Sequence, residues 1–175
     1  MTGLCITSLT EEALDRNLDS LAHLLVDTVA DGAAVSFLHP LAPDTARAFW
    51  RNDVFPHVRS GTRTLLTAHL SGTLAGTVQL LTGMPQNQPH RAEIAKMMVH
   101  PSARRRGIAR ALLNAALEHA RLQGKTNVTL DTRSGDVSQS LYASVGFQVA
   151  GIIPDFALDP DGQTLHSTTY MYKPL

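Results

Sequence analysis

The stretch that decides the fold is Glu93-Ile-Ala-Lys-Met-Met-Val-His-Pro-Ser-Ala-Arg-Arg-Arg-Gly-Ile-Ala-Arg-Ala-Leu-Leu113. It predicts an apolar strand that ends at Pro101, a short basic loop with one glycine, and a long amphipathic helix that begins at once. The first N–H groups of a helix have no partner inside it, so such a loop can bind an anion. A basic helix start on a solvated face is the alternative. Three arginines at the positive end of a helix are electrostatically unfavourable, however, and a bound polyanion would offset this repulsion.

Composition narrows the class of protein. The 175 residues include 15 Lys+Arg and 15 Asp+Glu, a balance that argues against a nucleic-acid-binding or membrane-surface protein. The length predicts a single domain over residues 1–175. Because the chain has one cysteine, no apolar run of about 20 residues and no secretory signal, we expect a cytoplasmic protein without a membrane span. Its eight histidines show no metal-ligand spacing, so we expect no metal site.

Hydrophobic periodicity predicts strands and helices that share one sheet. Leucines at spacings of three or four favour a helix over 11–30, and Gly76 inside a strand suggests a bulge or a close backbone approach. The expected order is strand 4–9, helix 11–30, a helix from Pro43 onwards, strands 63–70, 73–81 and 92–99, the helix after Gly107, strand 128–132, helix 137–144, and strands 147–153 and 167–172. This order predicts a mixed α/β or α+β fold.

Two motifs carry a resemblance to a known family. The first is Met97-Met98-Val99-His100-Pro101 followed by Arg104-x-x-Gly107-x-Ala109, and the second is Leu141-Tyr142-Ala-Ser-Val-Gly146-Phe147. Together they resemble the central strand, the pyrophosphate loop and the Leu-Tyr-x-x-x-Gly-Phe segment of the GNAT superfamily of acetyl-CoA-dependent N-acetyltransferases. The segment Asp31–Leu38 and the end of the chain look more specifically like bacterial members similar to the tabtoxin resistance protein.

The resemblance implies a strongly twisted mixed sheet of about seven strands with about four helices. A V-shaped opening would separate the central parallel strands 92–99 and 127–132 and admit acetyl-CoA as co-substrate. The pantetheine would pair with strand backbone, the pyrophosphate would sit on loop amides, and the arginine side chains could reach the 3′-phosphate. The expected cofactor contacts are Met97, Met98, Val99, Arg104, Arg105, Arg106, Gly107, Ile108 and Ala109, with Ser138 in place of the family's asparagine.

Acetyl transfer needs a neutral amine, a stabilised carbonyl oxygen and a proton for the leaving thiolate. We expect Glu93 to be the base, because strand alternation places it on the face of Met97 and Val99. An exposed strand-end glutamate is the alternative. By the resemblance, Asp131 is an acceptor anchor or auxiliary base, unless it is only a satisfied structural aspartate. By the same resemblance, Tyr142 is the general acid beside the CoA sulfur, with a plain core tyrosine as the alternative.

The acceptor half of the site is less defined. Segment 31–42 is either a packed connector or a substrate-lining loop that offers Ser36 and Phe37, which join Glu93 and Asp131 as expected acceptor contacts. We expect a small primary amine, amino-acid-like or antibiotic-like, as acceptor. A peptide or protein N-terminus and a non-catalytic acetyl-CoA sensor are the alternatives. A closed cover over the site would favour a small molecule, and an open groove would favour a peptide. The sequence does not decide between a monomer and a homodimer.

Overall fold

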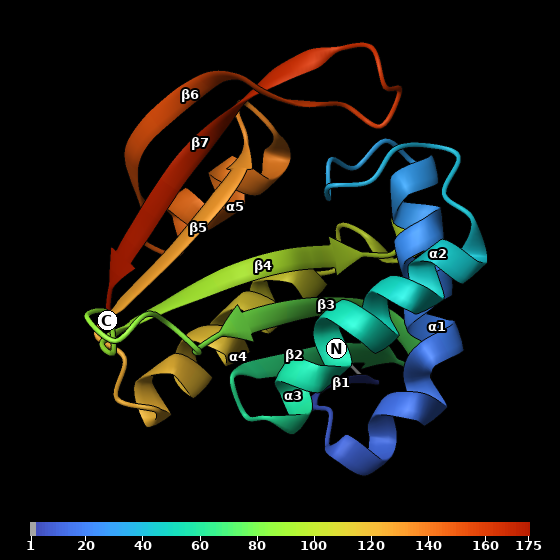
Figure 1. The fold of residues 1–175 in the computed structure, drawn as a ribbon, viewed down its shortest axis with the longest axis horizontal. Helices are drawn as coiled ribbons and strands as arrows, with labels where there is room; N and C mark the ends of the chain where they lie inside the picture. The colour runs from blue at the N-terminus through green and yellow to red at the C-terminus, as the bar shows by residue number, and fades with distance from the viewer. Residues whose placement is uncertain (1–2) are drawn as a thin grey trace.

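A computed structural model describes residues 3–175, in which seven strands form one sheet (Figure 1). The strand order is β1-β2-β3-β4-β5-β7-β6. Neighbouring strands pair antiparallel except β4 and β5, which are parallel. The strands are β1 Leu4–Ser8, β2 Arg63–Leu70, β3 Thr73–Leu81, β4 Arg91–Val99, β5 Asn127–Arg133, β6 Gln148–Leu158 and β7 Leu165–Pro174. The predicted mixed sheet is confirmed.

Helices cover both faces of this sheet. They are α1 Glu11–Ala30, α2 Pro43–Ala48, α3 Phe55–Arg59, α4 Ile108–Leu122 and α5 Val137–Ser144. A π-helical stretch, Phe49–Val54, joins α2 to α3 without a break. Residues 3–175 therefore contain four longer helical segments and one short 3-10 turn, Pro101–Ala103. One apolar core lies between the sheet and α1–α3, and a second lies on the opposite face with α4 and Tyr142 of α5. Each helix in the described part of the chain is too short or too polar to cross a lipid bilayer.

β4 and β5 separate after three paired positions. Their parallel register runs only from Arg91 opposite Asn127 to Glu93 opposite Thr129. Beyond Glu93, no strand of residues 3–175 pairs with β4 on its β5 side, and β5 continues beside β7 alone. Figure 1 shows the two ribbons diverging. The predicted V-shaped opening is confirmed, and one backbone edge of β4 faces into it.

A β-bulge interrupts β4 inside this opening. Thr77 of β3 lies opposite Met98, whereas Gln79 lies opposite Ala95, so β4 contains one extra residue. Lys96 lies in the bulge with a φ of 49°, in the left-handed region. The bulge therefore redirects the Lys96 side chain and shifts the alternation of everything after it.

This shift corrects the face predicted for Glu93. Ala92 and Ile94 before the bulge, and Met97 and Val99 after it, all pack on the α4 side of the sheet. Since neighbouring residues in a strand point to opposite faces, Glu93 faces α1–α3 and lies opposite to Met97 and Val99. Simple alternation counts no extra residue, so the sequence pattern placed Glu93 on the wrong face.

Gly76 lies beside the bulge, where the backbones of β3 and β4 approach closely. A Cβ at this position would lie 2.7 Å from the carbonyl oxygen of Met98, 3.2 Å from Leu112 Cδ1 and 3.3 Å from Val99 Cγ2. The close backbone approach predicted for Gly76 is confirmed. A side chain here would push β3 away from the strand that forms the edge of the opening.

β6 is longer than its predicted range, 147–153. It continues to Leu158 because its register shifts between Ile153 and Ala157, in a bulge that contains Pro154 and Asp155. The strand is at the edge of the sheet, where a proline without an N–H removes no ladder hydrogen bond. Proline was therefore a poor signal for the end of this strand.

Replacing Gly76 with alanine should destabilise the fold by about 1–3 kcal/mol, the usual cost of overpacking. Gly151→Ala is the matched control, because Gly151 also lies in a strand and nothing lies within 4 Å of its Cβ position. Urea unfolding of both variants measures the two free energies. Equal stability of Gly76→Ala and Gly151→Ala would contradict the close packing of β3 on β4.

Candidate active site

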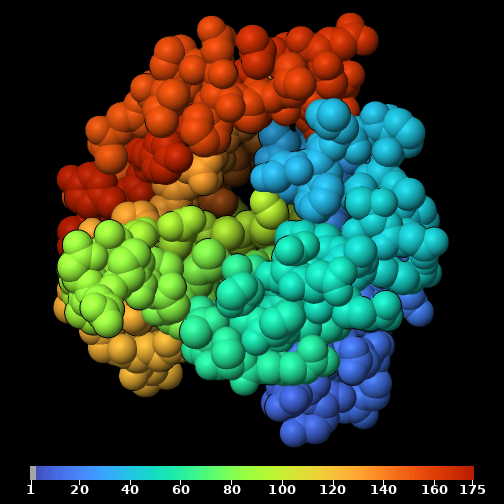
Figure 2. Space-filling view, in the orientation of Figure 1, coloured from blue at the N-terminus to red at the C-terminus, as the bar shows by residue number. Residues whose placement is uncertain are grey.

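A cavity of about 280 Å³ lies in the opening between β4 and β5. Its walls are the α1–α2 loop, the β4 segment 94–97, the end of β5, α5 and the β6–β7 hairpin. Figure 2 shows the hollow between the orange and red hairpin, the blue loop and green β4. The volume is close to the lower limit of about 300 Å³ that is usual for small-ligand sites.

The α1–α2 loop and the β6–β7 turn meet beside this cavity. The backbone N–H of His39 donates to the carbonyl oxygen of Pro160 at 2.8 Å. Leu38 Cδ1 also lies 3.8 Å from the Cβ position of Gly162. The two segments, far apart in the sequence, approach each other in Figure 1. Segment 31–42 and the hairpin thus form a cover on one side of the cavity.

An ion pair fixes the hairpin to β5. Arg133 donates from Nε to Asp159 Oδ1 at 2.7 Å and from Nη2 to Asp159 Oδ2 at 2.8 Å. His166 Nε2 lies 3.9 Å from the same carboxylate. The hydrogen bonds from Arg133 lower the pKa of Asp159. Arg133 and His166 both line the cavity, so this cluster holds the cover in place.

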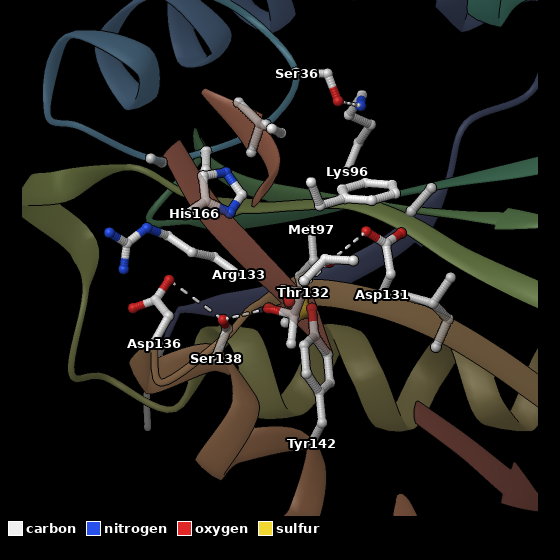
Figure 3. Close-up of a pocket in the computed structure, with 18 of the residues that line it drawn as sticks. Ser36, Lys96, Met97, Asp131, Thr132, Arg133, Asp136, Ser138, Tyr142 and His166 are labelled. Atoms are coloured by element: carbon white, nitrogen blue, oxygen red, sulfur yellow. Dashed lines mark hydrogen bonds between the residues drawn. The ribbon is translucent and has the colours of Figure 1, made fainter. Parts of the chain in front are cut away.

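Tyr142 is a buried residue of α5 whose hydroxyl points into the cavity (Figure 3). Its ring packs edge-on against Phe147, with centroids 5.9 Å apart. Burial raises the pKa of Tyr142, and the charges of Asp131 and Asp136 raise it further. The phenol therefore keeps its proton at neutral pH and remains a hydrogen-bond donor toward the cavity. Tyr142 is both a core side chain and a cavity residue, so the two interpretations of it are compatible.

Asp131 is exposed to the same cavity from β5. Its Oδ2 accepts a hydrogen bond from the hydroxyl of the buried Thr168 at 3.0 Å. The charge of Asp131 acts to raise the pKa of Lys96 as well as that of Tyr142. Asp131 is thus a hydrogen-bonded anion at the cavity, whose charge acts on both side chains.

Glu93 lies just before the cavity wall, which begins at Ile94 on β4. Its carboxylate accepts a hydrogen bond from Arg91 Nη1 at 3.1 Å. Arg91 in turn donates to the hydroxyl of Thr129 at 2.8 Å, across the last paired position of β4 and β5. The structure therefore brings Asp131 together with Tyr142, and leaves Glu93 at the closed end of the opening.

The remaining side chains predicted for the site divide into two groups. Ser138 lines the cavity, lies 2.8 Å from the Thr132 hydroxyl and donates to Asp136 at 3.3 Å. Ser36 also lines it. Phe37 instead packs into the core on the α1–α3 side, edge-on to Phe49 at 5.1 Å, and is not a wall residue. Segment 31–42 is consequently both a packed connector and a lining loop.

The loop before α4 has the backbone geometry of an anion site. Arg105 and Gly107 have left-handed φ values of 62° and 78°, and Gly107 precedes the first helical residue. Within residues 3–175, the backbone N–H groups of Arg105–Arg110 donate to no carbonyl or side chain. Six consecutive free donors at a helix N-terminus suit a bound phosphate.

The three arginines of this loop are not equivalent. Arg104 pairs with Asp31 at the end of α1 and contacts the Val99 carbonyl oxygen at 3.4 Å. Its guanidinium therefore fixes the loop to α1, which corrects the expectation that all three side chains reach toward a ligand phosphate. Arg105 and Arg106 are exposed. Ile108 is buried, so only its backbone can contact a ligand.

The cavity residues that were missed in the sequence include three basic ones, Lys96, Arg133 and His166. A lysine in an otherwise apolar strand was a signal for Lys96, but its direction depends on the bulge. Arg133 and His166 reach the cavity only because β5 and β7 pair, a long-range contact that local patterns do not contain. Among residues 3–175, no group of three or more His, Cys, Asp or Glu side chains is placed to hold a metal ion.

Known proteins share this sequence pattern and fold. The Acetyltransferase (GNAT) family matches residues 33–147. The uncharacterized N-acetyltransferase in the hisH-hisA intergenic region of Azospirillum brasilense is 31% identical over 135 residues, which are 73% of this chain and 77% of that protein. Two solved structures with a TM-score of 0.79 share the fold. YncA of Salmonella typhimurium, solved with its cofactor acetyl-CoA, is 19% identical to this chain. The match covers 99% of this chain and 95% of YncA. A GCN5-related N-acetyltransferase from Kribbella flavida is 22% identical, and the match covers 99% of this chain and 98% of that protein.

The chain therefore belongs to the GNAT family. It is an N-acetyltransferase by that membership, and the seven-stranded sheet with its split between β4 and β5 is the fold that the resemblance implied.

The raised pKa of Tyr142 can be measured by ultraviolet titration of the phenolate. The chain has three tyrosines, so the difference between the protein and Tyr142→Phe isolates this group. We expect its phenolate to form only above the ordinary tyrosine pKa of about 10, with circular dichroism to confirm that the protein stays folded. Ionisation at or below that value would contradict the burial of Tyr142 beside two carboxylates.

Proposed function

We propose that the protein transfers the acetyl group of acetyl-CoA to a primary amine of a small molecule by direct attack. The observation that carries this proposal is the covered cavity in the β4–β5 opening, which Asp131 of β5 and the protonated Tyr142 of α5 both line. A covered cavity of about 280 Å³ is of a size that suits a small acceptor. The exposed and unpaired Cys5 fits a reducing, cytoplasmic location.

Acetyl-CoA fits the free backbone groups that follow the bulge, on the β4 edge and in the loop before α4. Its pyrophosphate would accept hydrogen bonds from the N–H groups of Arg105–Arg110, and Arg105 and Arg106 would meet the 3′-phosphate. The pantetheine would lie along the unpaired edge of β4 at Met97–Val99, like an added strand. Ser138 is on the opposite wall, where it can contact the same arm. YncA, a structural neighbour solved with acetyl-CoA, supports this assignment.

An ammonium that becomes an amide loses two protons, one before it attacks and one as the carbon–sulfur bond breaks, and the departing thiolate takes up one. The amine nitrogen forms a bond to the acetyl carbon as the carbon–sulfur bond breaks, with a backbone N–H of Met98 or Val99 at the oxyanion. Asp131 would hold the incoming ammonium and take its proton, directly or through water. Tyr142 would donate to the departing thiolate. Because its pKa is raised above that of a thiol, about 8.5, a strong hydrogen bond rather than complete proton transfer is its expected contribution.

Glu93 remains the rival base. It faces the α1–α3 side of the sheet, where the α1–α2 loop also lies, and its carboxylate is paired with Arg91. From that position it would act through a water rather than by direct contact. Comparing Asp131→Asn with Glu93→Gln separates the two roles, because only the true base should remove the acidic limb of the pH–rate profile.

The cover formed by the α1–α2 loop and the β6–β7 turn supports a small acceptor over a peptide. A peptide needs an open groove, whereas the hydrogen bond between His39 and Pro160 closes one side of the cavity. A screen of small amines and of peptides for CoA release, read through the free thiol, tests the proposal. Turnover with peptides alone would instead indicate a peptide or protein N-terminus as the acceptor. If the protein binds acetyl-CoA but neither small amines nor peptides cause CoA release, the sensor role is favoured.

Tyr142→Phe should lower kcat by about 100-fold, in the range of general acid contributions. The dissociation constant of acetyl-CoA should change little, because the ring remains. Tyr172→Phe is the control, because Tyr172 lies outside the cavity lining, where its hydroxyl donates to Gln148 Oε1 at 2.9 Å. Steady-state kinetics and calorimetric binding measure both effects. A Tyr142→Phe enzyme with unchanged kcat would remove Tyr142 as the proton donor.

Gly107→Glu should abolish acetyl-CoA binding, because it adds bulk and negative charge at the proposed pyrophosphate site. Gly124→Glu controls for backbone strain and charge, since Gly124 also has a left-handed φ, 70°, and lies in the turn after α4. Isothermal titration calorimetry with acetyl-CoA compares the two folded variants. Wild-type affinity in Gly107→Glu would show that the cofactor does not use this loop.

A further inference from the structure

Lys96 is a cavity residue that the proposed reaction does not use. The bulge of β4 holds its backbone in the left-handed region, and its side chain extends across the cavity to the α1–α2 loop. There its Nζ donates to the hydroxyl of Ser36 at 2.7 Å, as Figure 3 shows. Ser36 also has a left-handed φ, 71°, which is unusual for a serine. Two strained backbone positions thus bring an ammonium and a hydroxyl together.

The Lys96 ammonium forms no direct salt bridge in the part of the chain that the structure describes. Within residues 3–175, no carboxylate oxygen lies within 4 Å of its Nζ. Burial lowers the pKa of Lys96, opposed by Asp131 and assisted by the nearby Arg63. An ammonium has three donors and Ser36 accepts one of them. The other two face a cavity, where an anion would be favourable and an apolar group would not.

The other cavity charges are already matched. Arg133 is paired with both oxygens of Asp159. Asp136 caps α5 by accepting from the Val137 N–H at 2.6 Å. Asp131 and Lys96 are left as an anion and a cation without ion-pair partners. An acceptor with only an ammonium would neutralise Asp131 and be repelled by Lys96, whereas an acceptor that also carries a carboxylate would neutralise both.

We infer that Lys96 and Ser36 form a carboxylate-binding subsite, and that the acceptor is an amino acid or an analogue with a carboxylate near its reacting amine. This inference rests on the proposed function and narrows its acceptor class. The carboxylate would accept hydrogen bonds from Lys96 Nζ and from the Ser36 hydroxyl, and the ammonium would face Asp131. The α1–α2 loop then selects the substrate through Ser36 rather than through Phe37, which packs away from the cavity.

The test compares each amino acid with its own carboxamide, which keeps the amine and side chain but removes the negative charge. Wild-type enzyme should show a higher kcat/KM for the acid. Lys96→Met should lower kcat/KM for the acids by about 10- to 100-fold, the value of one hydrogen bond to a charged group, and should leave the carboxamides nearly unchanged. Lys125→Met is the matched control, because Lys125 donates to backbone carbonyls of Thr82 and Pro89 outside the cavity.

Each result has a separate meaning. Equal kcat/KM for acids and carboxamides, or an equal loss for both in Lys96→Met, would overturn the subsite while the acetyltransferase proposal stands. If no amine is acetylated, the proposed function fails, and calorimetric binding of the same amino acids to the CoA complex still tests the subsite. Binding that is lost in Lys96→Met and kept in Lys125→Met supports it, and unchanged or absent binding overturns it.

Discussion

The whole site depends on the separation of β4 from β5 after only three paired positions. A central strand without a partner on one side exposes backbone donors and acceptors, which normally costs free energy unless something pairs with them. Here the exposed edge faces a cavity rather than bulk solvent. The bulge at Lys96 and the missing side chain at Gly76 keep this geometry, because they bend β4 and hold β3 close to it. A ligand arm that completes the sheet is the simplest way to satisfy the edge.

The charged and hydrogen-bonding groups around this opening are divided between its two ends. The α4 N-terminus offers free N–H groups at one end, while Asp131 and Lys96 face the cavity at the other. Between them Tyr142 keeps its proton because it is buried near two carboxylates. These groups come from four segments that meet only in the folded protein. Ion pairs outside the reaction, Arg104 with Asp31 and Arg133 with Asp159, hold the cofactor loop and the cover in position.

Much of this could be predicted from the sequence. The strand, loop and helix around Gly107 follow from local periodicity, which depends on nearby residues. The place of Tyr142 in the site follows from the resemblance of its segment to the GNAT family. The failures are long-range. One extra residue in β4 is visible only in its register with β3, so Glu93 was placed on the wrong face and Lys96 was not recognised. Phe37 was assigned to the site, whereas in the structure it packs edge-on against Phe49, partly buried against the α1–α3 core, and does not line the cavity. Pro154 did not end β6, because an edge strand tolerates a bulge.

The central claim is that the β4–β5 opening holds the thioester of acetyl-CoA beside Tyr142. A crystal structure of the acetyl-CoA complex measures this most directly, through the distance between the CoA sulfur and Tyr142 Oη. We expect a hydrogen-bonding distance, with the pyrophosphate on the amides of Arg105–Arg110 and the acetyl group directed toward Asp131. A complex in which the thioester lies outside the opening, or in which Tyr142 points away from the sulfur, would contradict it.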